Sequence, residues 1–188
     1  MKPLFTATAL AALLALTACD QANNAAGAAS AAETSSATQG DTGAIPAETS
    51  VKSRDGSFSI ALNSGYADKS QDPAYQPEGS KADNILLLQH SDSEGITVTA
   101  LRLGQSGDAA LDGIETALKA RDDLQDLSSS KQNGVLSYSF YSDSDGTTVN
   151  ESCRIQAAGK ELVSICAVSP YADATELEDL LKTVSFGS

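Results

Sequence analysis

Hydrophobic and polar residues alternate in short runs through the second two-thirds of the chain, a pattern typical of half-buried β-strands. Residues 57–62 read Ser-Phe-Ser-Ile-Ala-Leu, with polar and apolar positions in turn. Residues 85–88 are all apolar and too few for a helix, so we expect a strand buried on both faces. A β-rich run over 96–103 follows a turn at 91–95, and these two strands should form a hairpin.

Two segments have apolar residues at helical spacing on one face. The first predicts a helix over 108–124, which Asp108 can cap. The second follows Asp173, and Glu176 three residues later makes a near capping box. The apolar faces consist of Leu111, Ile114 and Leu118 in the first helix, and Leu177, Leu180 and Leu181 in the second.

Three strand candidates lie in succession between the two helices. They are residues 135–141, 147–157 and 162–168, joined by turns at 143–146 and 158–161. The last candidate is apolar on both faces, which fits a central strand covered on both sides. The element order therefore predicts an α+β fold, an α-β-α sandwich with a central, mainly antiparallel sheet, over residues 51–188.

The first residues have the form of a secretory signal peptide. Basic Lys2 precedes an apolar run over 4–16, which is too short to span a bilayer. Leu16-Thr17-Ala18-Cys19 resembles the lipobox of bacterial lipoproteins. This implies a signal peptide over 1–18 and an acylated Cys19 that becomes the first residue after cleavage. The alternative is an ordinary signal peptide with a chance cysteine.

Residues 19–50 are predicted to be a lipidated cysteine followed by a disordered tether. Ten of the 31 residues over 20–50 are Ala, and most of the others are small or polar. No apolar stripe is present to bury, so a flexible linker is expected. A coil of this length spans roughly 30 Å r.m.s., which would hold a globular domain at 51–188 clear of the headgroups.

The charge balance excludes some partners. Without residues 1–18, which carry only Lys2, the chain has 11 Lys and Arg against 25 Asp and Glu. A surface this acidic is repelled by nucleic acid and by anionic lipid headgroups. We therefore expect the acyl chains, rather than the domain, to bind the membrane. We expect the protein on the periplasmic side of the bacterial envelope. Asp20, directly after the cysteine, favours the inner membrane over the outer.

The other two cysteines form an even pair. Because disulfides persist in an oxidising compartment, Cys153 and Cys166 are predicted to be bonded. A hairpin centred between Gly159 and Lys160 places residue 153 directly opposite 166, and 155 opposite 164. The alternative is two buried thiols that act as small apolar residues.

Catalytic and metal-binding patterns are weak. His90 is the only histidine, no nucleophile-elbow sequence accompanies it, and a solvated histidine at a turn is expected. Asp143-Ser144-Asp145-Gly146 lacks the first and last ligands of a calcium loop and predicts a hairpin turn. The sequence therefore predicts no catalytic residue, no metal site and no cofactor.

Tyrosine supplies five of the nine aromatic residues. Tyr66 and Tyr75 lie in a segment, 66–83, that is rich in proline and polar residues and is expected to be irregular. Because tyrosine is enriched at binding surfaces, these two are the candidate partner-binding residues.

A family resemblance accompanies these patterns. Gly56–Leu62 after a lipoprotein tether, and Leu180–Phe186 at the end, resemble the DcrB-like periplasmic lipoproteins over roughly 55–188. The family commonly ends its first strand with proline, where this chain has Asn63-Ser64. The resemblance implies the Mog1/PsbP type of sandwich and a non-enzymatic envelope protein linked to phage uptake and membrane-protein homeostasis. Relatives of that fold act as adaptor subunits or as chaperones for secreted effectors.

Taken together, these observations predict a membrane-anchored, non-enzymatic binding or adaptor protein for another envelope protein. Segment 66–83 or a sheet edge would make the contact. The alternative is a small-ligand-binding protein that uses a cleft between sheet and helices, and a hydrolase is a distant third. An apolar cleft would favour the ligand binder, and an exposed tyrosine patch would favour the partner binder.

Overall fold

The computed structural model describes residues 48–144 and 146–187. The signal peptide, Cys19 and most of the tether lie outside these residues. The elements are β1 (Glu48–Lys52), β2 (Phe58–Asn63), β3 (Tyr66–Asp68), a 3-10 helix (Ala82–Asn84), β4 (Ile85–Ser91), β5 (Ile96–Arg102), α1 (Asp108–Lys119), β6 (Gln125–Gln132), β7 (Val135–Ser144), β8 (Thr147–Ala158), β9 (Glu161–Ser169), α2 (Ala174–Lys182) and β10 (Ser185–Phe186). No helix in this part of the chain is long and apolar enough to cross a membrane.

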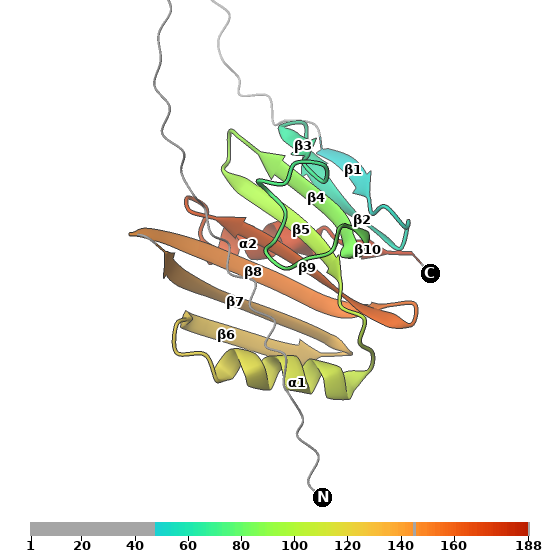
Figure 1. Cartoon of the computed structure of the whole chain (residues 1–188), viewed down its shortest axis with the longest axis vertical. Helices are drawn as coiled ribbons and strands as arrows, with labels where there is room; N and C mark the ends of the chain where they lie inside the picture. Colours follow the sequence, from blue (N-terminus) through green and yellow to red (C-terminus); the bar gives the residue numbers. More distant parts are fainter. Residues whose placement is uncertain (1–47, 145, 188) are drawn as a thin grey trace, which may run out of the picture.

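Seven strands form one antiparallel sheet in the order β3-β4-β5-β9-β8-β7-β6 (Figure 1). The hairpin of β4 and β5 and the run of β7, β8 and β9 are the strands expected from the sequence. Strands β1, β2 and β10 form a second, three-stranded sheet. This small sheet was not predicted, because a strand's alternation shows that one face is buried but does not show which sheet it joins.

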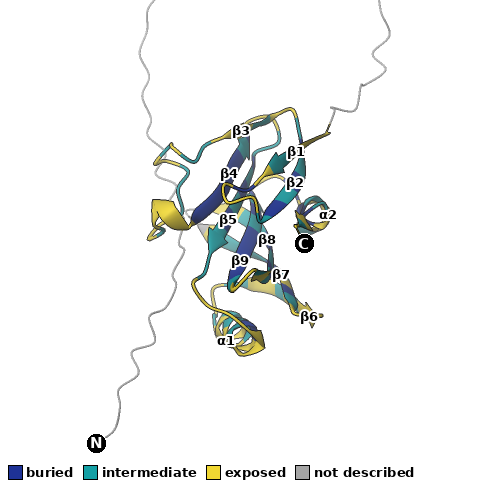
Figure 2. Cartoon of the chain, turned by 90° about the vertical axis from the view of Figure 1, so that its right-hand side faces the viewer, coloured by how far each residue is buried: buried dark blue, intermediate teal, exposed yellow. Residues whose placement is uncertain are grey.

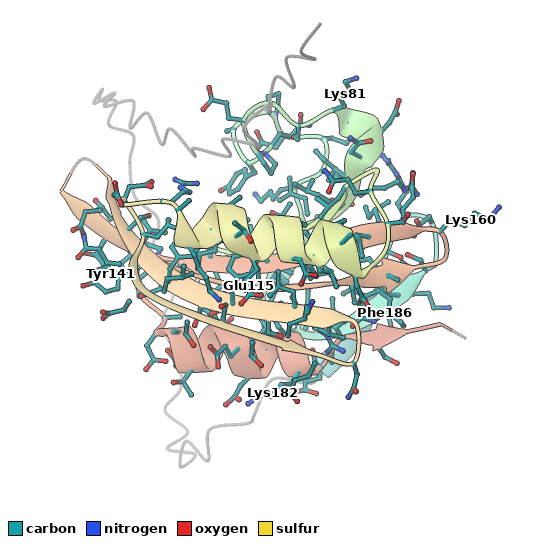
Figure 3. All side chains as sticks on the ribbon, turned by 90° about the horizontal axis from the view of Figure 1, so that it is seen from below. Lys81, Glu115, Tyr141, Lys160, Lys182 and Phe186 are labelled. Atoms are coloured by element: carbon teal, nitrogen blue, oxygen red, sulfur yellow. A yellow bond between two sulfur atoms is a disulfide. The ribbon has the colours of Figure 1, made fainter. Side chains whose placement is uncertain are left out.

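The two helices cover opposite faces of the large sheet. In β9, Val163 and Ile165 pack in a core with α2 and the small sheet, whereas Leu162 packs on the other face against Leu111 of α1. Figure 3 shows α1, which carries Glu115, and α2, which carries Lys182, on opposite sides of β6 and β7. In Figure 2 the buried positions concentrate in the strands between them. The predicted α+β class and α-β-α sandwich are confirmed, with the small sheet added beside α2.

Strand β6 was missed in the sequence analysis. Its sequence, QDLSSSKQ, contains one apolar residue, and none of its positions is fully buried. It is an edge strand that pairs only with β7. A strand with little to bury on either face has no alternation to detect, so the polar run resembles a loop.

Two predicted boundaries also change. Helix α1 ends at Lys119 rather than near Leu124, and Gly107 rather than Asp108 occupies its N-cap. Residues 48–50, assigned to the tether, form the first half of β1 and pair with β2 as far as Asn63. Both errors have the same cause. Each boundary lies among polar residues, and whether such residues belong to a helix or a strand depends on their hydrogen-bond partners, which the local sequence does not show. The capping box formed by Asp173 and Glu176 is present at the start of α2, as predicted.

Candidate functional site

A groove of about 610 Å³ runs between α2, the small sheet and the turn that joins β4 to β5. We call it the acidic groove. Its polar lining includes four carboxylates, two tyrosines, an amide and a hydroxyl: Glu48, Glu94, Glu176, Asp179, Tyr66, Tyr171, Asn63 and Thr183. No Lys or Arg contributes to this lining among the residues that the structure describes. A surface of this composition favours a cationic ligand.

Tyr66 lies at the floor of the groove because it begins β3, where it pairs with Ser91 and packs against the main core. Its hydroxyl oxygen is buried and has no hydrogen-bond partner within the described residues. Burial, and the nearby carboxylate of Glu94, raise the pKa of this hydroxyl. The hydroxyl therefore keeps its proton beside the carboxylate of Glu94, and it is too deeply buried to meet a ligand directly.

Glu94 is held in place from two sides. The side-chain amide of Asn63 donates to its Oε1, and its own backbone N–H donates to Ser91 Oγ at 3.3 Å. Asn63 is fixed in turn, because its Oδ1 accepts the backbone N–H of Gly65 at 2.8 Å. The carboxylate therefore has a defined position on the wall of the groove.

Tyr171 stands at the mouth of the groove and is 82% exposed, the large apolar side chain that the described surface displays most openly. Its ring lies against Gly95, where an added Cβ would come within 2.4 Å of Tyr171 Cδ2. Its backbone N–H and that of Ala172 both donate to Ser169 Oγ at 3.0 Å. An aromatic ring that is both exposed and positioned can bind with little loss of conformational entropy.

The structure does not bring the two predicted tyrosines together. Tyr66 pairs with Ser91 and faces the main core, whereas Tyr75 packs on His90 with ring centroids 4.8 Å apart, on the opposite face of the large sheet. The ammonium of Lys69 lies 5.0 Å from the centroid of the Tyr75 ring. Segment 66–83 therefore does not form one tyrosine surface, and only Tyr66 belongs to the acidic groove.

His90 is not the solvated turn residue that the sequence suggested. It lies within β4, its side chain is 15% exposed, and its Nδ1 is 3.0 Å from Thr97 Oγ1 on the neighbouring strand. Because Tyr75 covers its ring, the imidazole is part of the packing of this face. Among the described residues it meets no serine or cysteine nucleophile with which it could form a catalytic pair.

A second groove of similar size lies between α2 and strands β6, β7 and β8. We call it the serine groove. It is the cleft between sheet and helix that a small ligand could use, and four serines contribute to its wall: Ser128, Ser130, Ser137 and Ser139. Register explains the clustering, because Ser128 pairs with Ser139 and Ser130 with Ser137.

The predicted disulfide is present. Cys153 and Cys166 are bonded, and the register places Cys153 opposite Cys166 and Ile155 opposite Ser164, as the turn position predicted. With Glu151 they form a compact cluster of ligand-type atoms. Because the two sulfurs are bonded to each other, they are not thiolates and cannot hold a metal ion in this state.

Sequence reasoning named Tyr66 but did not single out Tyr171, Glu94 or Glu151. Tyr171 is important because of a contact with Gly95, a residue far away in sequence, so no local pattern reveals it. Glu151 is partly exposed and lies on the same face of β8 as Cys153 and Ile155, where a carboxylate breaks the apolar pattern. That break is the one signal that could have marked the residue.

No protein-family model matches the chain, and no curated protein matches it. Several solved structures match the chain, among them the following two. A crystal structure of a Bacteroides thetaiotaomicron protein has 14% identity and a TM-score of 0.46, and covers 74% of this chain. The Ran-binding protein Mog1p of Saccharomyces cerevisiae has 13% identity and a TM-score of 0.42, and the match covers 76% of this chain and 96% of Mog1p. This chain spans about half of the Bacteroides protein, 48% of its length.

Proposed function

We propose that this protein is a non-enzymatic binding protein that holds a partner envelope protein in the acidic groove. An acylated Cys19 would anchor it on the periplasmic side of the bacterial envelope, with the inner membrane favoured by Asp20. The observation that carries the binding role is the exposed, positioned ring of Tyr171 at the mouth of a groove lined by carboxylates.

The groove indicates the chemistry of the partner segment. Carboxylates on α2 and on the turn after β4 attract Lys or Arg, and charge complementarity of this kind gives specificity and a fast association rate. Leu180 and Ile96 add apolar surface between them. A segment with basic residues on either side of one aromatic or aliphatic residue fits this arrangement best.

The small-ligand alternative is less well supported. The serine groove combines four serine side chains with apolar surface from Val135 and Leu181, so it could accept a small ligand. The most exposed large aromatic side chain of the described residues, Tyr171, belongs to the acidic groove. The exposed ring of Tyr171 supports the partner binder over the small-ligand binder.

A peptide-binding experiment tests the binding role. Synthetic peptides of about ten residues, with Lys and Arg flanking one Leu or Tyr, would be titrated into the protein beside matched peptides with Glu in place of the basic residues. We expect the basic peptides to bind, more weakly at high salt, and Tyr171→Ala or the pair Glu176→Gln and Asp179→Asn to weaken binding about tenfold. Lys160→Ala, in the turn between β8 and β9, is the control and should bind normally.

Two results would overturn the binding role. One is equal binding of basic and acidic peptides. The other is binding of the basic peptides that Tyr171→Ala leaves unchanged. Anchoring is tested separately, because Cys19→Ala should leave an unprocessed, unacylated precursor. A soluble, processed wild-type product would contradict the proposed lipid anchor. It would not affect the proposal that the acidic groove binds a partner.

A further inference from the structure

The disulfide lies in the middle of the large sheet, on the face that α1 covers. Cys153 pairs with Tyr138 on β7 and with Cys166 on β9, and Cys166 in turn pairs with Thr99 on β5. Glu151 precedes Cys153 by two residues, so its side chain is on the same face. The register thus places a carboxyl group beside a disulfide.

Glu151 contacts the disulfide directly. Its Oε1 is 3.1 Å from Cys153 Sγ. A disulfide sulfur carries no hydrogen, so a hydrogen bond across this contact needs a protonated carboxyl as its donor. Burial raises the pKa of Glu151 to about 7, against the opposing effect of the Arg121 guanidinium. The carboxyl therefore holds its proton up to neutral pH.

The charged and titratable groups around Glu151 leave this proton in place. Arg121, from the loop after α1, donates from Nε to Asp123 Oδ1 at 2.9 Å and is thus already paired. Burial raises the pKa of Tyr138 on β7, so this hydroxyl stays neutral. No ion pair in the described part of the chain includes Glu151.

The two cysteine residues differ in exposure. Cys153 is 2% exposed, whereas Cys166 is partly exposed, as is Thr99 beside it. Ser164 Oγ lies 3.4 Å from Cys166 Sγ. In thiol–disulfide exchange the incoming thiolate attacks the accessible sulfur, and the other sulfur leaves. Cys166 is therefore the sulfur to be attacked, and Cys153, beside Glu151, is the leaving group.

We propose that Cys153–Cys166 is a redox-active disulfide that exchanges with an external dithiol, and that Glu151 donates a proton to the Cys153 sulfur as it leaves. The reductant's thiolate bonds to Cys166 Sγ, the Cys153–Cys166 bond breaks, and Glu151 protonates Cys153. The reductant's second thiolate then attacks its own sulfur in the mixed disulfide, and Cys166 leaves and takes a proton from solvent. Glu151 regains its proton from solvent. The protein disulfide is reduced to two thiols, and the dithiol is oxidised to a disulfide.

The sheet should keep the two thiols together after reduction. Strands β8 and β9 pair through nine residue positions, and the cysteines occupy the fourth of these. Reoxidation can therefore run the same steps in reverse, with the Glu151 carboxylate as the base that deprotonates Cys153. The proposal does not depend on the acidic groove, which lies on the other face of the large sheet.

The test is the rate of reduction of the mature, acylated protein in detergent by excess dithiothreitol, followed by acid quenching and thiol alkylation. Rates are divided by the thiolate concentration of the reductant, since only the thiolate attacks. In the wild type this normalised rate should fall about tenfold from pH 5.5 to pH 8.5, with a midpoint near 7. Glu151→Gln should react about tenfold more slowly at low pH and show no midpoint.

Glu178→Gln, an exposed carboxylate change on α2, is the matched control and should keep the wild-type profile. A reduction rate that does not depend on dithiothreitol concentration would mean that the bond opens only when the domain unfolds, and would overturn the proposal. A pH profile shared by wild type and Glu151→Gln would overturn it too. Should Glu151→Gln fail to fold, as checked by circular dichroism, a pH-independent normalised rate in the wild type overturns it alone.

Discussion

Arg102, the last residue of β5, donates from Nη2 to Asp55 Oδ2 at 2.8 Å and so joins the large sheet to the turn between β1 and β2. Asp55 also accepts the backbone N–H of Ser57 at 3.0 Å, the hydroxyl of Ser57 at 2.7 Å and the hydroxyl of Ser53 at 3.0 Å. One carboxylate thus organises a turn and holds two sheets together.

Asp55→Asn should destabilise the protein in a pH-dependent way. Burial alone would raise the pKa of Asp55, but the hydrogen bonds from Ser57, Ser53 and Arg102 lower it to about 2. A depressed carboxyl pKa stabilises the fold above the unfolded value near 4, and this contribution is lost as the pH falls to about 2. Because both partners are about one-third exposed, solvent screens the pair, and we expect a loss of about 1 kcal/mol at neutral pH.

Chemical denaturation of wild type and Asp55→Asn at a series of pH values measures this loss. The difference in the free energy of unfolding should shrink from neutral pH towards pH 2. Asp122→Asn, in the exposed loop after α1, should show no such difference. A difference that stays constant over the acid range would contradict the assignment to the Asp55 carboxylate.

Gly95→Ala should destabilise the protein by about 2 kcal/mol. Two causes act together, because Gly95 has φ +63° and an added Cβ would come within 2.4 Å of the Tyr171 ring. A double-mutant cycle separates them. In the Tyr171→Ala background the ring is absent, so Gly95→Ala should cost only the backbone part, about 1 kcal/mol. Equal costs in both backgrounds would show that the ring does not rest on Gly95.

Removing the disulfide should weaken the fold without abolishing it. The bond closes a short loop of sequence separation 13, and the chain-entropy model gives about 3 kcal/mol for such a loop. The variant with both Cys153→Ala and Cys166→Ala should therefore melt about 10 °C lower than the oxidised protein, with the same far-ultraviolet circular dichroism. Loss of the β-sheet signal in this variant would mean that the bond is required for folding.

Asp173→Ala should destabilise helix α2 by about 1 kcal/mol. Asp173 Oδ1 accepts the backbone N–H of Glu176 at 3.0 Å, and Glu176 Oε2 accepts the backbone N–H of Asp173 at 3.1 Å. Asp173→Asn keeps an acceptor at the cap and should recover most of the stability, as measured by thermal unfolding. An asparagine variant as unstable as the alanine variant would rule out a capping effect.

Sequence reasoning worked best where a local rule determines a distant contact. The turn at Gly159 sets the register of β8 against β9, and that register alone places Cys153 opposite Cys166. The capping box of α2 and the doubly buried β4 follow from equally local patterns. These features need no knowledge of the rest of the fold.

The candidate site was predicted much less well, because tertiary contacts assemble it. Tyr66 and Tyr75 are nine positions apart in sequence, and nothing local shows that the sheet separates them. The contact between Gly95 and Tyr171 joins segments that no pattern connects. Polar β6 was missed for a related reason, since its strand form depends on pairing with β7.

The small sheet joins segments from both ends of the described chain, and this affects the order in which the protein can fold. Strand β2 pairs on one side with β1 and on the other with β10, so the first and last strands of the described chain meet on one strand. The acidic groove needs Glu48 from β1 and Asp179 from α2 at once. Contacts so distant in sequence form late, because the intervening chain must first be ordered. A chain whose C-terminal residues have not yet been synthesised therefore lacks the acidic groove.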